Sequence, residues 1–378
     1  MNIPFAKPYI INDKEIEAVS MVIKSGWLTH GPKTIEFEKK FANYIGTKYA
    51  IAVNSCTSAL FLSLKTIGVK NGDEVITTPF TFAATANTIV HCGARPVFVD
   101  IKKDTFNIDP NKIEEKITKK TKAIVAVHYA GQPADVTKIK KIADKYNLKI
   151  VEDAAHAVGS VYDTGEKVGA VNNLACFSFY VTKPITTGEG GMITTNDEKL
   201  CKKLKILRMH GIDRDAWNRY NNKGSWYYKI IEAGYKCNTT DLNSAIGLKQ
   251  LEKIDWMNKK RKELAEFYDK SLKKIPQVEL YKIKDNIKSS YHLYPILLKG
   301  IDRNEFLNKM KKSGITCSVH FIPLQLMPFY QRKFHYKKGD FPVCESVYEK
   351  IVSLPIYPAL TKQNIKYIVD AIEKILRC

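Results

Sequence analysis

The stretch TKAIVAVHYAGQPADVTKIKKIADKYNLKIVED, residues 121–153, contains two short apolar runs with a longer amphipathic segment between them. The runs at 121–128 and 148–153 are rich in β-branched residues, which is typical of strands buried on both faces. Between them, residues 133–147 place apolar side chains three or four positions apart, which indicates a helix. This order predicts two parallel strands joined by a crossover helix.

The same alternation recurs along much of the chain. Further strands are predicted at 49–55, 73–78 and 95–100, and further helices at 13–26, 33–46, 56–69 and 80–93. Repeated strand and helix units indicate an α/β fold with a mostly parallel sheet covered by helices on both faces. After a long helical stretch the pattern changes to a smaller α+β unit that includes predicted strands at 289–298 and 314–321. We therefore expect a large domain at 12–250 and a small one at 251–378, with residues 1–11 packing near the small domain.

The composition excludes several classes of protein. The 378 residues are 44% hydrophobic and 11% aromatic, which is in the range of folded globular proteins. No apolar segment is long enough to span a bilayer, and the N-terminus has no signal-peptide pattern, so we expect a cytoplasmic protein without a membrane partner. The eight cysteines are scattered without a C-x-x-C pair, which is typical of reduced structural thiols and not of a disulfide or metal site.

The formal net charge of +21 raises the question of an acidic partner. The lysines are spread along predicted helices and do not form clusters interleaved with aromatic residues, so we do not expect nucleic acid to be the partner. Solvated lysine-rich surfaces are the ordinary explanation of this charge, and a local positive field would in addition attract an anionic substrate.

Asp153 comes at the end of a predicted buried strand. In parallel sheets ligands bind at the carboxyl ends of the strands, and this rule selects Asp153, residues 54–58 and His128 as candidates. A buried carboxylate needs a cationic partner. Capping of the next turn is the ordinary alternative role for Asp153.

Lys183 lies in the stretch ACFSFYVTKP, whose alternating apolar residues predict a strand that ends at the lysine. The position before Pro184 favours extended backbone. Partial desolvation lowers the pKa of a lysine and makes its amine a better nucleophile towards aldehydes. The alternative is a lysine that extends from the strand end into solvent.

The stretch NSCTSAL, residues 54–60, opens a predicted helix with small residues. Free backbone N–H groups at such a position bind a phosphate without a basic side chain, although simple helix capping by Ser55 or Thr57 is an equally ordinary explanation. A phosphate site, a strand-end carboxylate and a reactive amine are together what pyridoxal 5'-phosphate requires.

The order of motifs resembles the DegT/StrS-type sugar aminotransferases, which are pyridoxal phosphate enzymes of fold type I. The resemblance runs from SGWLTHGP to SLPIYP and rests on VNSCTSAL, PFTFAATAN, VEDAAHAVGS, FSFYVTKPITTGEGG and GYKCNTTDLNSAIGL. Each motif alone is a modest signal, but the ordered set is specific. It implies an aspartate aminotransferase-like large domain, with a mostly parallel sheet flanked by helices, and a smaller C-terminal α+β domain.

The resemblance also implies roles for individual residues. Lys183 would form the Schiff base with the cofactor, and Asp153 would pair with its pyridine nitrogen. Phe82 would stack on the cofactor ring, and His156 would contact its O3′. The phosphate would be bound by Thr57, Ser58, Ser178 and, from the neighbouring copy in a homodimer with shared active sites, Asn238.

The implied reaction transfers the amino group of L-glutamate to a nucleotide-linked keto sugar. UDP-4-keto-6-deoxy-N-acetylhexose, aminated at C4, is the expected substrate. The alternatives are dTDP- or GDP-linked sugars, a UDP-4-keto-pentose and amination at C3. Candidate substrate contacts are Trp27, Thr29, His210 and His320.

Two other functions stay open on the sequence. One is a pyridoxal phosphate-dependent dehydratase or epimerase, and the other is a regulator that binds the cofactor or a sugar nucleotide without catalysis. Related dehydratases replace the Schiff-base lysine with histidine, so the presence of Lys183 argues for transamination. Two departures, His156 where glutamine is frequent and Tyr180 where histidine is frequent, bear on the choice of substrate.

Overall fold

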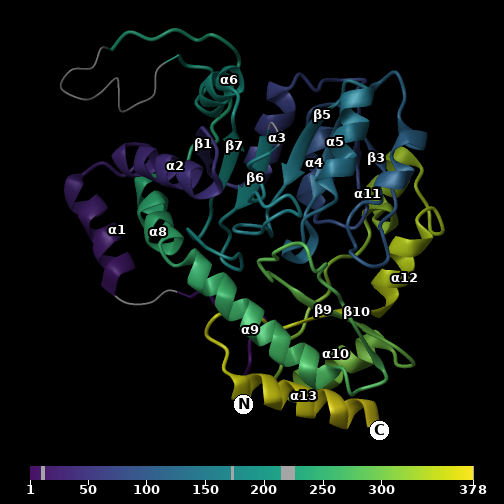
Figure 1. Cartoon of the computed structure of the whole chain (residues 1–378). Helices are drawn as coiled ribbons and strands as arrows, with labels where there is room; N and C mark the ends of the chain where they lie inside the picture. Colours follow the sequence, from purple (N-terminus) through teal and green to yellow (C-terminus); the bar gives the residue numbers. More distant parts are fainter. Residues whose placement is uncertain (10–12, 172–173, 214–225, 378) are drawn as a thin grey trace.

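Two β-sheets organise the chain in the computed structural model, which describes residues 1–9, 13–171, 174–213 and 226–377 (Figure 1). Among these residues, one sheet has seven strands in the order β1-β7-β6-β5-β4-β2-β3, and the other has three in the order β10-β9-β8. The strands are β1 Tyr49–Val53, β2 Glu74–Thr77, β3 Arg95–Phe98, β4 Thr121–Val127, β5 Lys149–Asp153, β6 Leu174–Ser178, β7 Gly191–Thr195, β8 Val278–Leu280, β9 Tyr294–Leu298 and β10 Ile351–Leu354.

The helices that surround the sheets follow the predicted amphipathic segments closely. In α5, for example, the Asp135 side chain accepts a hydrogen bond from the Lys138 N–H at 3.2 Å, and Ile139 and Ile142 are buried. The helices are α1 Asp13–Ser25, α2 Pro32–Ile45, α3 Cys56–Thr66, α4 Ala83–His91, α5 Val136–Lys145, α6 Glu198–Arg208, α8 Asp241–Leu251, α9 Ile254–Leu272, α10 Arg303–Lys312, α11 Pro328–Phe334, α12 Pro342–Lys350 and α13 Lys362–Arg377. None of the described helices combines the length and the apolar character needed to cross a bilayer.

The large sheet is parallel except around β7. This strand runs antiparallel to both of its neighbours, β1 and β6, whereas the pairs from β6 across to β3 are parallel. Because two reversals cancel, β1 points in the same direction as β6. The carboxyl ends of β1, β2, β4, β5 and β6 therefore lie at the same edge of the sheet, and the predicted mostly parallel sheet is confirmed.

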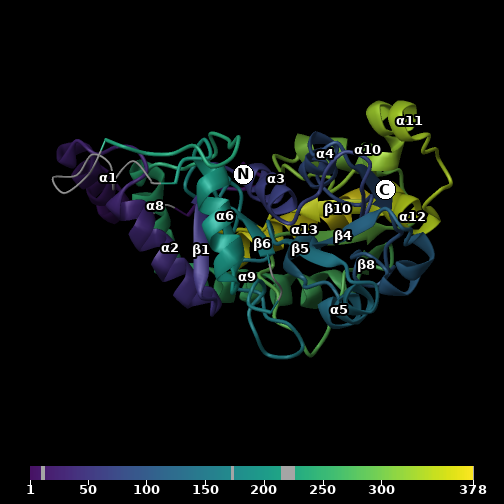
Figure 2. The same cartoon turned by 90° about the horizontal axis from the view of Figure 1, so that it is seen from above.

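Helices cover both faces of the large sheet. Ile51 and Val53 of β1 pack in a cluster with α3 and α6, whereas Ala50 and Ala52 face the opposite side and pack with α2 and α8. Figure 2 shows α4 and α5 on opposite sides of the sheet. This arrangement buries successive side chains of a strand in different clusters, which explains the continuous apolar runs in β1 and β4.

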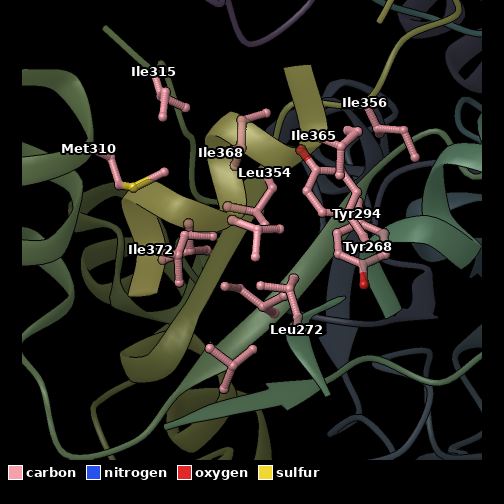
Figure 3. Packing of buried hydrophobic residues seen from close by; sticks show 14 of the residues in the cluster. Tyr268, Leu272, Tyr294, Met310, Ile315, Leu354, Ile356, Ile365, Ile368 and Ile372 are labelled. Carbon is pink, nitrogen blue, oxygen red and sulfur yellow. The ribbon is translucent and has the colours of Figure 1, made fainter. Parts of the chain in front are cut away.

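The three-stranded sheet forms a second core with α9, α10 and α13 (Figure 3). On α13 the buried residues Ile365, Ile368, Ile372 and Ile375 recur every three or four positions and form one face of the helix. Each contributes about 1.5–3 kcal/mol by leaving water. The long helix α9 connects this core to α8 beside the large sheet (Figure 1).

We propose that the chain divides into two domains near residue 250, between α8 and α9. The predicted start of the large domain at residue 12 lies outside the described residues. The first nine residues contact the second core, because Ile3 is buried in it and its N–H donates to the Gly314 oxygen at 2.8 Å.

Two predicted strands differ from the structure. β6 ends at Ser178, and Lys183 lies in the following turn, where its backbone N–H donates to the Tyr180 oxygen at 2.9 Å. The register pairs Ser178 with Gly191, the first residue of β7, so β7 has no residue opposite Lys183 or Pro184. The predicted strand at 314–321 is reduced to isolated bridges from Ile315 to Ile3 and from Ser318 to Ser353.

Candidate active site

A cavity of about 500 Å³ lies at the edge of the large sheet where the parallel strands end. Val127, Asp153 and Ser178, the last residues of β4, β5 and β6, line one wall. His292 and His320, from segments that adjoin the three-stranded sheet, line the other. The volume suits a cofactor together with part of a small substrate.

The start of α3 opens onto this cavity. Ser55 caps the helix, and its Oγ accepts a hydrogen bond from the Ser58 N–H at 3.1 Å. Thr57 lines the cavity, and Ser178 faces it from β6. Ser58 does not line it, because its Oγ donates to Asn54 Oδ1 at 2.6 Å. A helix start with free N–H groups and nearby hydroxyls is a suitable site for a phosphate group.

Gly191, the first residue of β7, lies directly against the start of α3. A Cβ at this position would come within 2.5 Å of the Ser55 carbonyl carbon and 2.7 Å of the Cys56 nitrogen. Protein interiors are too closely packed to accept such contacts. Glycine at 191 therefore allows the start of β7 to pack directly against the start of α3.

The Asp153 carboxylate is held at the end of β5 with only 7% of the residue exposed. Thr85 Oγ1 donates to Oδ2 at 2.7 Å, and the Ala155 N–H donates to Oδ1 at 3.2 Å. Burial raises the pKa of Asp153, and these two hydrogen bonds oppose the increase. A fixed, desolvated carboxylate of this kind binds a cationic N–H group strongly.

The Lys183 side chain is half-buried, and it lines the cavity. Burial lowers the pKa of Lys183 to about 8, even though the Asp153 carboxylate raises it. With that pKa roughly a tenth of the amine is neutral at pH 7, compared with well under a thousandth for an ordinary lysine. The amine is therefore available as a nucleophile and as a base.

Three histidines lie together on the cavity wall. The ring of His156 packs on that of His292, with the centroids 4.4 Å apart, and burial lowers the pKa of both well below the ordinary value. His320 Nδ1 lies 3.0 Å from Ser353 Oγ, and burial lowers the pKa of His320 to about 4. All three imidazoles are thus neutral at pH 7 and can both donate and accept hydrogen bonds.

Several residues selected from the sequence do not line this cavity. His128 is directed into the protein, where its Nε2 lies 2.8 Å from Glu152 Oε2 and its Nδ1 accepts from the Ala134 N–H. Trp27 Nε1 donates to the His30 oxygen, while Thr29 and His210 are exposed elsewhere on the chain. Asn238 follows Cys237, whose oxygen accepts from the Asn54 N–H, so Asn238 is close to the start of α3 without entering the cavity.

The structure also adds residues that the sequence analysis did not single out. Thr85 fixes Asp153, and His292, Phe321 and Phe5 line the cavity. Thr85 belongs to the PFTFAATAN motif, so its presence in that motif could have indicated a role in the site. Phe5 gave no signal, because only the tertiary structure brings the N-terminal segment to the cavity.

The charge of the cavity wall is small. Among the described residues that line it, Lys183 is the only lysine or arginine, and Asp153 and Glu189 are the acidic residues. The high net charge of the chain is therefore not concentrated in this cavity.

Comparison with known proteins identifies the family of this chain. The sequence model of the DegT/DnrJ/EryC1/StrS aminotransferase family matches residues 9–373. The chain belongs to this family. The relative SpsC of Bacillus subtilis, a spore coat polysaccharide biosynthesis protein, is 44% identical over 380 residues, which cover 99% of this chain and 97% of SpsC. The uncharacterized protein MJ1066 of Methanocaldococcus jannaschii is 52% identical over 370 residues, which cover 97% of this chain and 96% of MJ1066.

Solved structures of sugar aminotransferases agree with the fold. The PMP-form of the putative sugar aminotransferase Spr1654 of Streptococcus pneumoniae superposes with a TM-score of 0.94 at 33% identity, covering 100% of this chain and 99% of Spr1654. PseC of Helicobacter pylori, an aminotransferase involved in the biosynthesis of pseudoaminic acid, superposes with a TM-score of 0.91 at 33% identity over the full length of both chains. This DegT-family member is therefore a pyridoxal phosphate-dependent sugar aminotransferase, and the predicted fold, enzyme class and cofactor are confirmed.

The residues of the cavity fit this cofactor. The start of α3, with no side chain at Gly191 beneath it, accommodates a phosphate, and the buried carboxylate of Asp153 suits a protonated ring nitrogen. The lowered pKa of Lys183 suits an amine that reacts with an aldehyde. These three features line the same cavity, so a single cofactor molecule can contact them together.

Proposed function

We propose that this aminotransferase converts a UDP-linked 4-keto-6-deoxy-N-acetylhexose into the 4-amino sugar, with L-glutamate as amino donor, in amino-sugar or polysaccharide biosynthesis. The observation that carries the proposal is the meeting of Lys183, Asp153 and the start of α3 in one cavity. The kinship with PseC and SpsC supports an amino-sugar substrate.

Each of these residues has a defined task in the proposed reaction. When bound, pyridoxal phosphate supplies an electron sink for the negative charge that develops at the reacting carbon. The N–H groups at the start of α3, with Thr57 and Ser178, would hold the phosphate. Asp153 would keep a proton on the ring nitrogen. Lys183 Nζ takes up the proton that leaves the α-carbon of the donor and delivers a proton to the sugar carbon in the second half of the reaction.

Two further residues complete the proposed cofactor site. Phe82 lines the cavity and is 63% exposed, so its ring face is available for stacking on the cofactor ring. His156 is neutral and buried beside the cavity, which suits a hydrogen bond to the cofactor O3′. In the net reaction glutamate is oxidised to 2-oxoglutarate and the C4 carbonyl is reduced to an amine, so no external redox partner is required.

The proposal includes a homodimer with shared active sites. L-Glutamate brings two carboxylates and a sugar nucleotide brings a pyrophosphate, but Lys183 is the only lysine or arginine among the described residues that line the cavity. Additional cationic or amide groups must therefore come from outside it. Asn238 lies next to the start of α3 without entering the cavity of its own chain, and this position supports its proposed role in the cavity of the neighbouring copy.

A panel of nucleotide-linked keto sugars tests the substrate. We expect release of 2-oxoglutarate from L-glutamate with the UDP-linked 4-keto-6-deoxy-N-acetylhexose, and turnover at least about tenfold lower with dTDP-linked, GDP-linked and pentose analogues, because contacts to the nucleotide and the acetamido group are lost. The position of the new amine is read from the product by NMR. Preference for another sugar, or an amine at C3, would contradict the proposed substrate.

Mixing two inactive variants tests the shared site. Lys183→Ala removes the reactive amine from one cavity, and Asn238→Ala removes the proposed amide from the neighbouring one. In a mixed dimer one cavity has both substitutions and the other has neither. Random exchange of an equal mixture makes about half of the dimers mixed, so about a quarter of the specific activity of the unmodified dimer should return. Sedimentation with one labelled protomer shows that exchange has occurred. Subunit exchange without any recovery of activity would contradict the shared active site.

A further inference from the structure

The first nine residues form a fixed segment that reaches the active site. The Ile3 N–H donates to the Gly314 oxygen, and the Thr316 N–H donates back to the Ile3 oxygen at 3.0 Å. Ile3 is 2% exposed and belongs to the core of the three-stranded sheet. Further along, Tyr9 packs against Trp256, with the ring centroids 4.8 Å apart. The segment is therefore anchored on both sides of Phe5.

Phe5 places its ring in the cavity wall. The ring is stacked on that of His320, with a centroid separation of 5.3 Å and an interplanar angle of 25°. His320 is held in turn by Ser353 Oγ, and Phe321 extends the same wall with its ring centroid 5.1 Å from that of His320. Phe5, His320 and Phe321 together form an aromatic wall of the cavity. This wall has little freedom to move, because Ile3 and Tyr9 anchor the segment that bears Phe5 and Ser353 holds His320.

This aromatic wall is distinct from the wall that suits the cofactor. The groups that fit pyridoxal phosphate come from the strand ends of the large sheet and from α3, whereas Phe5, His320 and Phe321 come from segments beside the three-stranded sheet. A substrate that reacts at the cofactor must lie between the two walls. Phe321 also reaches the cofactor side, since its ring centroid lies 5.9 Å from that of His156 and 6.2 Å from that of Phe82, whereas the ring of Phe5 stacks on His320. Within this aromatic wall, Phe5 is therefore placed to contact the substrate and not the cofactor.

The chemistry of this wall favours one of the two substrates. His320 is neutral, so the wall has no charge with which to bind the carboxylates of L-glutamate. A hexose presents C–H groups on the face of its ring, and a 6-deoxy sugar also presents a methyl group. Such apolar surfaces pack well on aromatic rings.

We propose that Phe5 is a specificity-determining residue that packs against the keto sugar and has no part in the glutamate half of the reaction. This inference rests on the proposed function only in taking a nucleotide-linked sugar as the second substrate. It assigns to the N-terminal segment a role in substrate binding.

The two halves of the reaction separate this role from a structural one. In Phe5→Leu, the pyridoxamine phosphate-loaded enzyme should bind the amino-sugar product about tenfold more weakly by calorimetry, because the flat aromatic face is lost. The rate at which L-glutamate converts the pyridoxal phosphate-loaded enzyme, followed by cofactor absorbance, should stay within about twofold. Phe5→Tyr keeps the ring and should retain most of the affinity. Phe267→Leu is the matched control, since Phe267 is a partly buried ring that packs against the core of the three-stranded sheet and does not line the cavity.

The sugar used is the one that the unmodified enzyme prefers in the panel described above. The proposal would be overturned if Phe5→Leu reduced the affinity for the amino sugar and the rate with L-glutamate equally. It would also be overturned if Phe5→Leu reduced neither of them. A preference for a dTDP- or GDP-linked sugar would refute the proposed substrate instead, and the Phe5 comparison would then be made with that sugar. The two failures are therefore distinguishable.

Discussion

Lys183→Ala should abolish transamination, with turnover at least about 10⁴-fold lower than in the unmodified enzyme. The cavity contains no other lysine among its described lining residues, so no second amine can take over the chemistry. Release of 2-oxoglutarate in the presence of L-glutamate and keto sugar measures the loss. The purified enzyme should be yellow from its bound cofactor, and the variant should lose that absorption band.

The fold should survive this substitution. Burial lowers the pKa of Lys183 to about 8, so at pH 7 the folded protein holds a charged amine in an unfavourable environment that the unfolded chain does not impose. Removing the side chain therefore should not reduce the free energy of unfolding measured in urea. Lys199→Ala, at an exposed position in the first turn of α6, is the control and should leave both activity and colour unchanged. Turnover above about 1% in Lys183→Ala would refute the catalytic role.

Asp153→Asn should lower turnover by about 10²–10³-fold. The amide has nearly the same shape as the carboxylate and can still accept the hydrogen bond from Thr85, but it has no negative charge to keep a proton on the cofactor ring nitrogen. Steady-state kinetics with L-glutamate and keto sugar measure this effect. Asp144→Asn, at an exposed position on α5, is the control.

The same variant has a pH signature. The Asp153 carboxylate raises the pKa of Lys183, so its removal should move that pKa below about 8. Neutral amine then forms at lower pH, and the rate at which cofactor-free protein takes up pyridoxal phosphate should level off at a lower pH than in the unmodified protein. An unchanged pH profile, or turnover within about threefold of the unmodified enzyme, would contradict the proposed role of Asp153.

Much of the fold followed from patterns with a simple physical cause. The apolar runs in β1 and β4 arise because both faces of the large sheet are covered, and α5 and α13 have the spacing of helices with one buried face. The end of β6 was misplaced because apolar residues continue beyond Ser178 into the turn that bears Lys183. Among them Phe179 is buried against Phe37 and Phe41 of α2, whereas Tyr180 is 45% exposed. Periodicity cannot distinguish the burial of Phe179 from burial in a sheet.

The sequence predicted those site residues that combine a reactive or polar side chain with a position at the end of a parallel strand. Asp153 and the start of α3 lie where the rule for parallel sheets puts ligands, whereas His128 obeys the same rule but bonds inward to Glu152. Which way a strand-end side chain points depends on the neighbouring elements, and one sequence does not contain that information. Phe5 and His292 were missed because they reach the cavity from distant parts of the chain.

The pairing of β1 with β7 also bears on how this enzyme folds. β1 lies at the edge of the large sheet, and its partner strand begins only at residue 191. On a growing polypeptide, β1 therefore stays unpaired while about a third of the chain, from residue 54 to residue 190, is synthesised. Contacts so distant in sequence form slowly. Until they form, an apolar strand is left with unpaired N–H and C=O groups, which is the condition under which chains associate with one another. Newly made protein should therefore be most vulnerable to aggregation before β7 has been synthesised, and truncated chains that end before residue 191 should be the least soluble.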